Sequence, residues 1–363
     1  MHLHNRVIYK NNRIRQQYNT VYTIGYQKIK IIRISICLVN KEKLRERLSI
    51  REYFHELGIG SVTVKKLEAL GIRSVEELLM FTKEELVDLG ISERVVGKLV
   101  INARQIIRKK KNRKIVYTAG ELEQRGRRLF TTGCKSLDGL LGGGIETGAL
   151  TEFAGEFGSG KTQICHQLAV TVQLPPEKGG LDAKALYIDT EKAFSWERVY
   201  SIASRFNLSK DYVKNRIYVV QVANVEELEY FVKVDLRREV PVEELGLMIV
   251  DSLISHFRAE LIGLDKLAQR QQRINYLCNW LFRYAFIYNL AVVYTNQVTQ
   301  VVNGYVRYKK PAGGTVLEHA ATYRILLRKA KENTSIATLI DSPRLPKLSV
   351  EFKITENGIE DVS

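Results

Sequence analysis

Eight consecutive residues have the types and spacing of a Walker A phosphate loop: Gly155-Glu156-Phe157-Gly158-Ser159-Gly160-Lys161-Thr162. The glycines let backbone N–H groups converge on phosphate oxygens, while the lysine suits the β- and γ-phosphates and the threonine suits Mg²⁺. An apolar segment, 149–154, precedes the loop, and 163–170 after it has helical spacing. Because strand, loop and helix N-terminus together form an anion site, we expect the eight residues and Gln163 to bind ATP. Lys161 would contact the phosphates, and Thr162 would hold Mg²⁺.

Two acidic residues follow predicted strands and suit metal binding and hydrolysis. The apolar run 246–250 ends at Asp251, which we expect to orient Mg²⁺ through its water shell. The run 185–188 is followed by Glu191, the best candidate for the group that activates the attacking water. A carboxylate at a strand end is often structural or merely exposed. Both assignments therefore depend on these strands ending beside the phosphate loop.

The elements that must position these residues alternate between strands and helices over 119–363, which predicts an α/β fold with a mainly parallel central sheet and right-handed crossovers. A helix is expected over 265–288. After residue 320 the runs are short and separated by polar turns, so we expect antiparallel strands added at one edge. The strand-like runs are 185–188, 217–222, 247–250, 290–295, 323–327, 336–340 and 348–354.

Before this core, 49–107 is predicted to be a small all-α domain. We expect Ser61 to cap a helix carrying Val64, Leu67 and Leu70, Gly71 to end it, and Ser74 to cap the next. After 89–92, a further helix carries apolar residues at Val95, Val96, Leu99 and Ile101. Such paired helices resemble helix-hairpin-helix modules, whose turns offer backbone N–H groups to nucleic-acid phosphates. A small packing or protein-docking domain is the alternative.

The net charge of +16 is concentrated in two segments. Residues 1–40 hold seven Lys/Arg and no acid, and 108–114 hold six more. Clustered positive charge suits DNA or RNA, although a solvated tail and linker is the plain alternative. We interpret 1–48 as a basic, disordered N-terminal extension or a translated upstream segment, and 108–118 as a basic linker.

Hydropathy and cysteine usage bear on the compartment. No apolar run approaches the roughly 18 residues of a membrane span, so no membrane partner is expected. Cys37, Cys134, Cys165 and Cys278 stand far apart, which favours reduced thiols. We therefore expect a cytoplasmic protein, and the family resemblance given below implies that it is nucleoid-associated.

From about Thr131 onward the chain resembles the ATPase core of the archaeal RadA recombinases and their eukaryotic counterparts, within the RecA superfamily. The helical domain ahead of it matches the family layout. The resemblance implies a DNA-dependent ATPase that uses ATP and Mg²⁺. It would assemble as a homo-oligomeric helical filament or ring on single-stranded DNA and exchange that strand with double-stranded DNA. The segments that carry it are 132–138, 142–148, 155–163, 172–175, 188–191, 250–252, 295–298 and 341–343.

The resemblance also implies roles for single residues. Glu191 matches the water-activating glutamate, and Gln297 matches a glutamine that links the γ-phosphate to the second DNA loop. His319 matches a histidine near the phosphates across the subunit interface, and Arg198 matches an arginine that stacks on adenine. Two DNA loops are expected, although the second, 298–312, has a polar connection as its alternative. Their basic residues are Arg258, Lys266 and Arg270 in 257–270, and Arg307, Lys309 and Lys310 in 298–312.

Several residues depart from the family pattern. The inter-subunit anchor, normally a Phe followed three residues later by Ala, corresponds here to Val116 and Ala119, and Val116 fills less of a partner's pocket. Leu261 and Leu264 replace an aromatic residue and an arginine in the first loop. Arg307 stands where an acidic residue often binds a cation. Val116 and the altered DNA loops favour, as an alternative, an accessory paralogue that binds ATP and helps to load another recombinase. A scaffold that uses ATP only to assemble is a third hypothesis, and the retained Glu191 argues against it.

Overall fold

The computed structural model describes residues 50, 59–110, 116–303 and 306–362. The predicted extension, 1–48, and part of the predicted linker, 111–115, lie outside these residues. The predicted domain boundaries stay predictions, although the described helices and sheet follow the same division. Within the described residues, no helix is both long and apolar enough to cross a bilayer.

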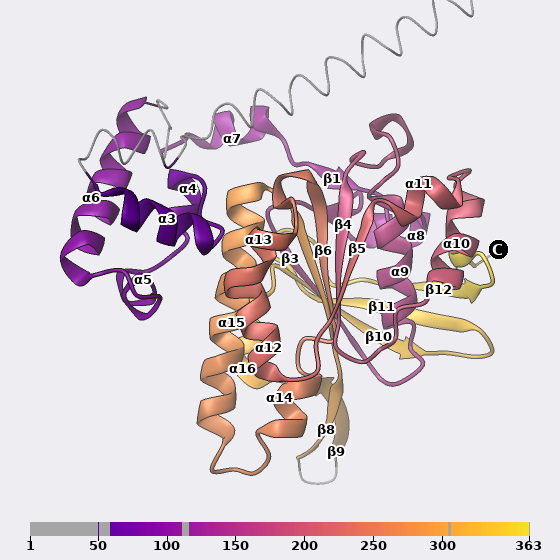
Figure 1. The fold of residues 1–363 in the computed structure, drawn as a ribbon. Helices are drawn as coiled ribbons and strands as arrows, with labels where there is room; N and C mark the ends of the chain where they lie inside the picture. Colours follow the sequence, from indigo (N-terminus) through magenta and orange to yellow (C-terminus); the bar gives the residue numbers. More distant parts are fainter. Residues whose placement is uncertain (1–49, 51–58, 111–115, 304–305, 363) are drawn as a thin grey trace, which may run out of the picture.

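A nine-stranded sheet forms the centre of the molecule, in the order β13-β12-β11-β10-β3-β7-β6-β4-β5 (Figure 1). The six strands from β10 to β5 run parallel, and β11, β12 and β13 are added antiparallel at one edge. This arrangement confirms the predicted mainly parallel α/β fold. The strands are β3 (Leu150–Gly155), β4 (Lys184–Asp189), β5 (Ile217–Gln221), β6 (Leu245–Asp251), β7 (Ala291–Asn296), β10 (Tyr323–Lys329), β11 (Thr334–Asp341), β12 (Ser349–Thr355) and β13 (Gly358–Asp361).

Helices cover both faces of the sheet, so its central strands are buried on both sides (Figure 1). In β6, Leu247 and Ile249 join the core cluster under α9, while Met248 and Val250 join the cluster under α15, because successive side chains of a strand alternate between faces. The helices of the core are α8 (Lys135–Leu140), α9 (Lys161–Thr171), α10 (Trp196–Arg205), α11 (Lys210–Lys214), α12 (Val225–Tyr230), α13 (Leu236–Glu239), α14 (Ser255–Glu260), α15 (Leu267–Tyr288) and α16 (Gly314–Ala320).

Short elements complete the core. The strands β1 (Leu129–Phe130) and β2 (Ile145–Glu146) pair antiparallel. Helix α7 (Ala119–Arg125) precedes them, and η1 (Pro176–Lys178), the π-helical turn η2 (Phe231–Asp235) and η3 (Val242–Glu244) connect larger elements. The edge strand β13 is tied back to α8, since the Asp361 carboxylate accepts the backbone N–H groups of Lys135 at 3.1 Å and Ser136 at 2.7 Å.

One expectation for the core is wrong, and both segments expected to form DNA loops contain regular secondary structure. The segment containing 323–327 was expected to be an antiparallel addition, but β10 lies parallel to β3 inside the sheet. It does so because α16 supplies the crossover that a parallel strand needs. The second expected DNA loop is a separate antiparallel hairpin, β8 (Val298–Asn303) and β9 (Val306–Pro311), and the first is helical in α14 over its opening residues.

The N-terminal region is helical, as predicted, with α3 (Ser61–Ala69), α4 (Val75–Leu78), α5 (Lys83–Asp88) and α6 (Glu93–Lys110). Ser74 forms the expected cap, as a capping box with Glu77. Ser61 does not cap α3, because Gly60 occupies the N-cap and Ser61 is already helical. Ile101 is 52% exposed, because the buried face of α6 has the helical spacing of Val96, Leu99, Val100 and Ala103.

This helical region contacts the core along α15. The ring of Phe81 meets Trp280 edge-on with ring centroids 4.9 Å apart, and Tyr288 Oη donates to Glu77 at 2.7 Å. The Glu85 carboxylate accepts from Trp280 Nε1 at 3.1 Å and from Arg283 Nη1 at 2.9 Å. The contacts are therefore apolar and charged together. Elsewhere, the three described cysteines are buried and free, and Cys37 lies outside the described residues.

Candidate functional site

The phosphate loop lies between the buried strand β3 and helix α9, as the motif requires. A Cβ atom on Gly155 would lie 2.7 Å from the carbonyl oxygen of Leu327, so only glycine fits where β3 passes β10. Gly160 caps α9 at φ 98°, a left-handed conformation that glycine adopts without strain. Gly158 also has a left-handed φ of 75°, so local sterics explain all three glycines of the motif.

Lys161 is positioned inside this loop. Its Nζ donates to the carbonyl oxygens of Gly155 at 2.9 Å and Glu156 at 2.8 Å. Burial lowers the pKa of Lys161, while the nearby Asp251 and Glu191 carboxylates oppose the shift. The side chain of Phe157 is fully exposed, and that of Glu156 turns outward toward the β8–β9 hairpin, so the loop offers mainly backbone groups to a phosphate.

Asp251 ends β6 and is 2% exposed. Tyr187 Oη donates to its carboxylate at 2.7 Å, and the Thr295 hydroxyl donates to the other oxygen. Each carboxylate oxygen can accept more than one hydrogen bond, so both keep capacity for a metal-bound water. Within the described residues, no three His, Cys, Asp or Glu side chains cluster. Mg²⁺, which takes one or two protein oxygens plus substrate phosphates, fits the donors that Thr162 and Asp251 supply.

Glu191 follows β4, and its Oε1 accepts from the Ser252 hydroxyl at 2.8 Å. Asp189, at the end of β4, accepts the backbone N–H groups of Glu191, Ala193 and Phe194 and so orders the turn that presents Glu191. Asp189 pairs directly with Asp251 across the two strands. The motif reading missed Asp189, although its place at the strand end was a usable signal.

Arg198 lies in the first turn of α10, where it borders a cavity of about 450 Å³ shared with Gly158 and Gln163. Its Nε donates to Gln163 Oε1 at 2.5 Å, and its two terminal nitrogens donate to the carbonyl oxygens of Thr355 and Glu356. Burial lowers the pKa of Arg198, and Glu356 opposes the shift. The Thr355–Glu356 wall comes from the far end of the chain, and no local pattern marked it.

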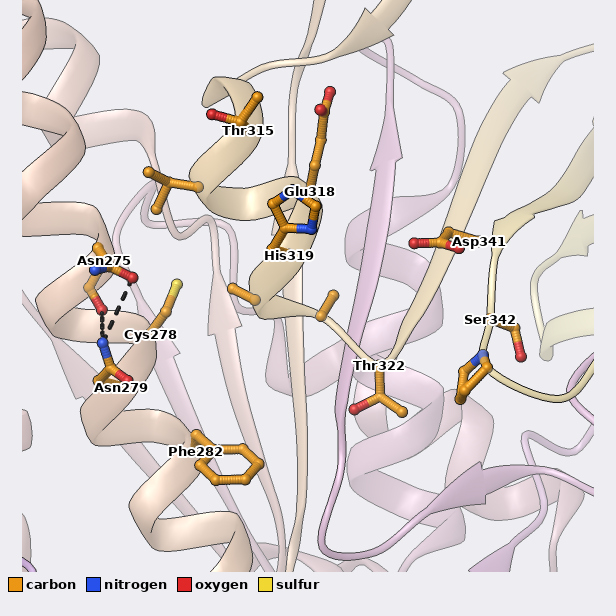
Figure 2. A pocket seen from close by; sticks show the side chains of 14 residues that line it. Asn275, Cys278, Asn279, Phe282, Thr315, Glu318, His319, Thr322, Asp341 and Ser342 are labelled. Carbon is orange, nitrogen blue, oxygen red and sulfur yellow. Dashed lines mark hydrogen bonds between the residues drawn. The ribbon is translucent and has the colours of Figure 1, made fainter.

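His319 occupies a different cavity, of about 800 Å³, between α15, α16 and the end of β11. Figure 2 shows His319 and Glu318 on α16 facing Asp341 and Ser342. This cavity shares no lining residue with the one beside Arg198. Within one chain, therefore, His319 and Arg198 do not meet.

The structure connects the expected DNA segments to the nucleotide loop. Gln297 Oε1 accepts from Arg258 Nη1 at 2.7 Å, and Lys309 forms an ion pair with Glu156 of the phosphate loop. Arg270 Nη1 instead donates to the Leu261 carbonyl oxygen at 3.0 Å. Lys266 and Lys310 are exposed, and the side chain of Arg307 lies outside the described part of the chain.

The expected oligomerisation residues are accessible. Val116 is 80% exposed, and Ala119 is exposed at the start of α7. His166 is a further residue of the site region that the motifs did not indicate. It is buried against Tyr187 and Phe194, and its Nε2 accepts the Ser195 N–H at 3.1 Å. Burial lowers the pKa of His166 to about 4.

Comparisons with known proteins agree with the nucleotide-site geometry described above. The model of the Rad51 family matches residues 126–362, which is more than half of the chain. A curated protein from Ignicoccus hospitalis, named DNA repair and recombination protein RadA, is 44% identical over 314 residues, which cover 84% of this chain and 94% of the relative. The chain therefore belongs to the Rad51 family, the ATP-binding recombinases of DNA repair and homologous recombination.

Proposed function

We propose that this DNA-dependent ATPase assembles as a filament on single-stranded DNA and catalyses homologous pairing and strand exchange. The observation that carries the proposal is the contact between the basic hairpin and the nucleotide loop. Lys309 of β9 pairs with Glu156, and Arg258 of α14 holds Gln297 at the end of β7. A DNA phosphate that bound Lys309 would break its ion pair with Glu156, and one that bound Arg258 would break its hydrogen bond to Gln297. Either contact would therefore change the surroundings of a residue at the ATP site.

The residues of the ATP site divide the chemical work. Lys161 leaves the loop carbonyls for the β- and γ-phosphates, and the N-terminus of α9 adds its dipole. Thr162 and Asp251 would hold Mg²⁺, and the bound ion would supply positive charge beside the transferring phosphoryl group. Glu191, held by Ser252, orients the attacking water. The cavity beside Arg198 suits the adenine base, since a guanidinium plane stacks on aromatic rings.

The hairpin and the nearby helix ends supply the DNA-binding groups. Lys309 and Lys310 of β9 are exposed, as is Lys266 before α15, and Arg258 lies in α14. These cations suit phosphates and read no sequence, so binding is expected to be strongly salt-dependent. Arg307 is proposed as a further DNA-binding residue because it lies in β9, two residues before Lys309.

Assembly completes the site between two copies. His319 faces a cavity separate from that of Arg198, which supports a role toward the nucleotide of a neighbouring subunit rather than its own. Val116 and Ala119 are accessible for insertion into that neighbour. ATP turnover should consequently rise when DNA assembles the subunits.

The test combines ATP hydrolysis with strand exchange. Glu191→Gln should lower DNA-stimulated phosphate release by about a hundredfold or more, since general-base groups contribute that much, and should leave ATP binding intact. Glu197→Gln, a similar exposed carboxylate nearby, is the matched control. With ATP and Mg²⁺, the unaltered protein should form joint molecules between single-stranded and homologous duplex DNA. Folded, DNA-bound protein that yields none would refute the strand-exchange proposal.

One observation favours a second candidate, an accessory paralogue that helps to load another recombinase. Val116, in place of the usual phenylalanine, presents less apolar surface to a partner's pocket. Electron microscopy on single-stranded DNA with ATP separates the two candidates. Continuous helical filaments support the recombinase, whereas short or absent assemblies support the accessory role. Val116→Phe should lengthen assemblies if the anchor limits them.

A further inference from the structure

A buried carboxylate lies behind the phosphate loop. Glu152, in the middle of β3, is 0% exposed, and it comes three residues before Gly155. Its Oε1 accepts from Asn296 Nδ2 at 2.6 Å, and its Oε2 accepts from Arg324 Nε at 2.6 Å. Burial raises the pKa of Glu152, while Arg324 and Asn296 oppose the shift. Burying a carboxylate this deeply costs free energy of folding. Its two partners lie on the strands that flank β3.

Each partner leads to a different part of the proposed site. Asn296 ends β7, immediately before Gln297, and its Nδ2 also donates to the Ala312 carbonyl oxygen at 2.7 Å. The Ala312 N–H donates to the Gln297 carbonyl oxygen at 2.8 Å, so Asn296 closes the base of the β8–β9 hairpin. Arg324 begins the strand that follows α16, the helix of Glu318 and His319.

The cluster keeps unused hydrogen-bonding groups. Among the described residues, Asn296 Oδ1, Arg324 Nη2 and the Tyr294 hydroxyl are buried without a hydrogen-bond partner. Tyr294 lies directly opposite Glu152 in the pairing of β3 with β7. Buried polar groups without partners are costly, so a second arrangement of this network that paired them would be favoured, and a two-state element needs such an arrangement.

We propose that Glu152 is a positioning residue that couples the ATP-bound state of the phosphate loop to the DNA hairpin, through Asn296, and to α16, through Arg324. This inference rests on the proposed function, because it assigns DNA binding to the hairpin. Glu152 touches neither ATP nor DNA. It fixes the position of the phosphate loop, at the end of β3, relative to the base of the hairpin that follows β7.

The test measures coupling directly. The affinity for a fluorescent, slowly hydrolysed ATP analogue is measured with and without oligo(dT), and the affinity for oligo(dT) with and without the analogue. The two ratios must agree, since coupling is reciprocal. Glu152→Gln and Asn296→Ala should each reduce the ratio about fivefold or more, toward one, while analogue affinity without DNA changes by less than about twofold.

Tyr284→Phe is the matched control. It also removes buried hydrogen bonds, one donated to the Val232 carbonyl oxygen at 2.8 Å and one accepted from Arg237 Nη1, but Tyr284 contacts neither loop. Glu152→Gln and Asn296→Ala could each melt at a lower temperature, as the control does, and still keep the full ratio of affinities. That result would show that Glu152 has only a structural role. Asn296→Ala leaves the buried ion pair in place, so the test survives if Glu152→Gln does not fold. Wild-type protein with a ratio of one would instead refute the DNA-dependent function, and the coupling role with it.

Discussion

The contact of the N-terminal helices with α15 depends on one carboxylate, Glu85, which is 6% exposed. It accepts from the Trp280 indole N–H at 3.1 Å, from Arg283 at 2.9 Å and from the backbone N–H of Thr82 at 2.7 Å. The last bond completes the capping box of α5. Glu85→Ala should therefore weaken the helix and its docking at once.

The size of the loss follows from these three bonds. The cap is worth about 1 kcal/mol. The indole bond to a charged acceptor is worth about 1.5 kcal/mol. The Arg283 side chain is 24% exposed, so water partly replaces its lost partner, and the ion pair is worth about 1 kcal/mol. Glu85→Ala should cost about 3 to 4 kcal/mol of docking free energy.

The chain provides its own reporter of docking. It has two tryptophans, and Trp196 is 58% exposed while Trp280 is buried in the contact. In a Trp196→Phe background, emission reports the surroundings of Trp280 alone. Urea titration should show a red shift at lower urea in Glu85→Ala than in the parent protein. Combining it with Arg283→Ala should give a coupling of about 1 kcal/mol.

The control is Glu84→Ala, a neighbouring carboxylate in the first turn of the same helix that is exposed. It should shift the transition by less than about 0.5 kcal/mol. The reasoning fails if Glu85→Ala behaves like Glu84→Ala. It fails equally if the Glu85 and Arg283 losses are simply additive, since the two side chains would then not interact in solution.

Three further predictions concern the site. Lys309→Ala should reduce the magnitude of the slope of log affinity for oligo(dT) against log salt concentration by about 0.7. Lys347→Ala, which changes an exposed lysine outside the hairpin, should leave the slope unchanged. Equal slopes for the two variants would show that Lys309 does not contact DNA. His166 stays neutral in the folded state down to about pH 4, whereas the unfolded chain binds a proton from its ordinary value of 6.5 downward. The free energy of unfolding should therefore fall by up to about 3 kcal/mol between pH 6.5 and 4, and His166→Gln should not show this part of the loss. Parallel curves of stability against pH for the two proteins would contradict this. Asp251→Asn should raise the Mg²⁺ concentration needed for half-maximal ATP turnover about tenfold or more, and an unchanged requirement would assign the metal elsewhere.

The local features of this protein were predictable because the chemistry that demands them is local. The phosphate loop needs glycines at fixed spacing, and Asp251 ends a run apolar enough to identify a buried strand. The capping box of Ser74 and Glu77 is likewise contained within four residues. Such features depend on neighbours in sequence, which a single chain displays in full.

Features that depend on distant partners were missed. Arg198 is held by the carbonyl oxygens of Thr355 and Glu356, and nothing near Arg198 in sequence indicates them. The β8–β9 hairpin was not predicted because apolar and basic residues alternate over only the four residues 306–309, while 298–303 lacks the alternation of a half-buried strand. The burial of Val100 rather than Ile101 was not predictable from residue type, because both are apolar and only the phase of the whole helix decides which is buried.

The tie between Asp361 and α8 joins positions 226 and 225 residues apart. Ribosomes release a chain from its N-terminus, so β13 reaches its partners only after every other described strand has been made. The same late segment brings the carbonyl oxygens that hold Arg198. A nascent chain thus contains the residues of the phosphate loop long before it contains the wall that holds Arg198. Contacts of such separation form slowly, so the cavity beside Arg198 takes shape only after the C-terminal strands have been made and docked.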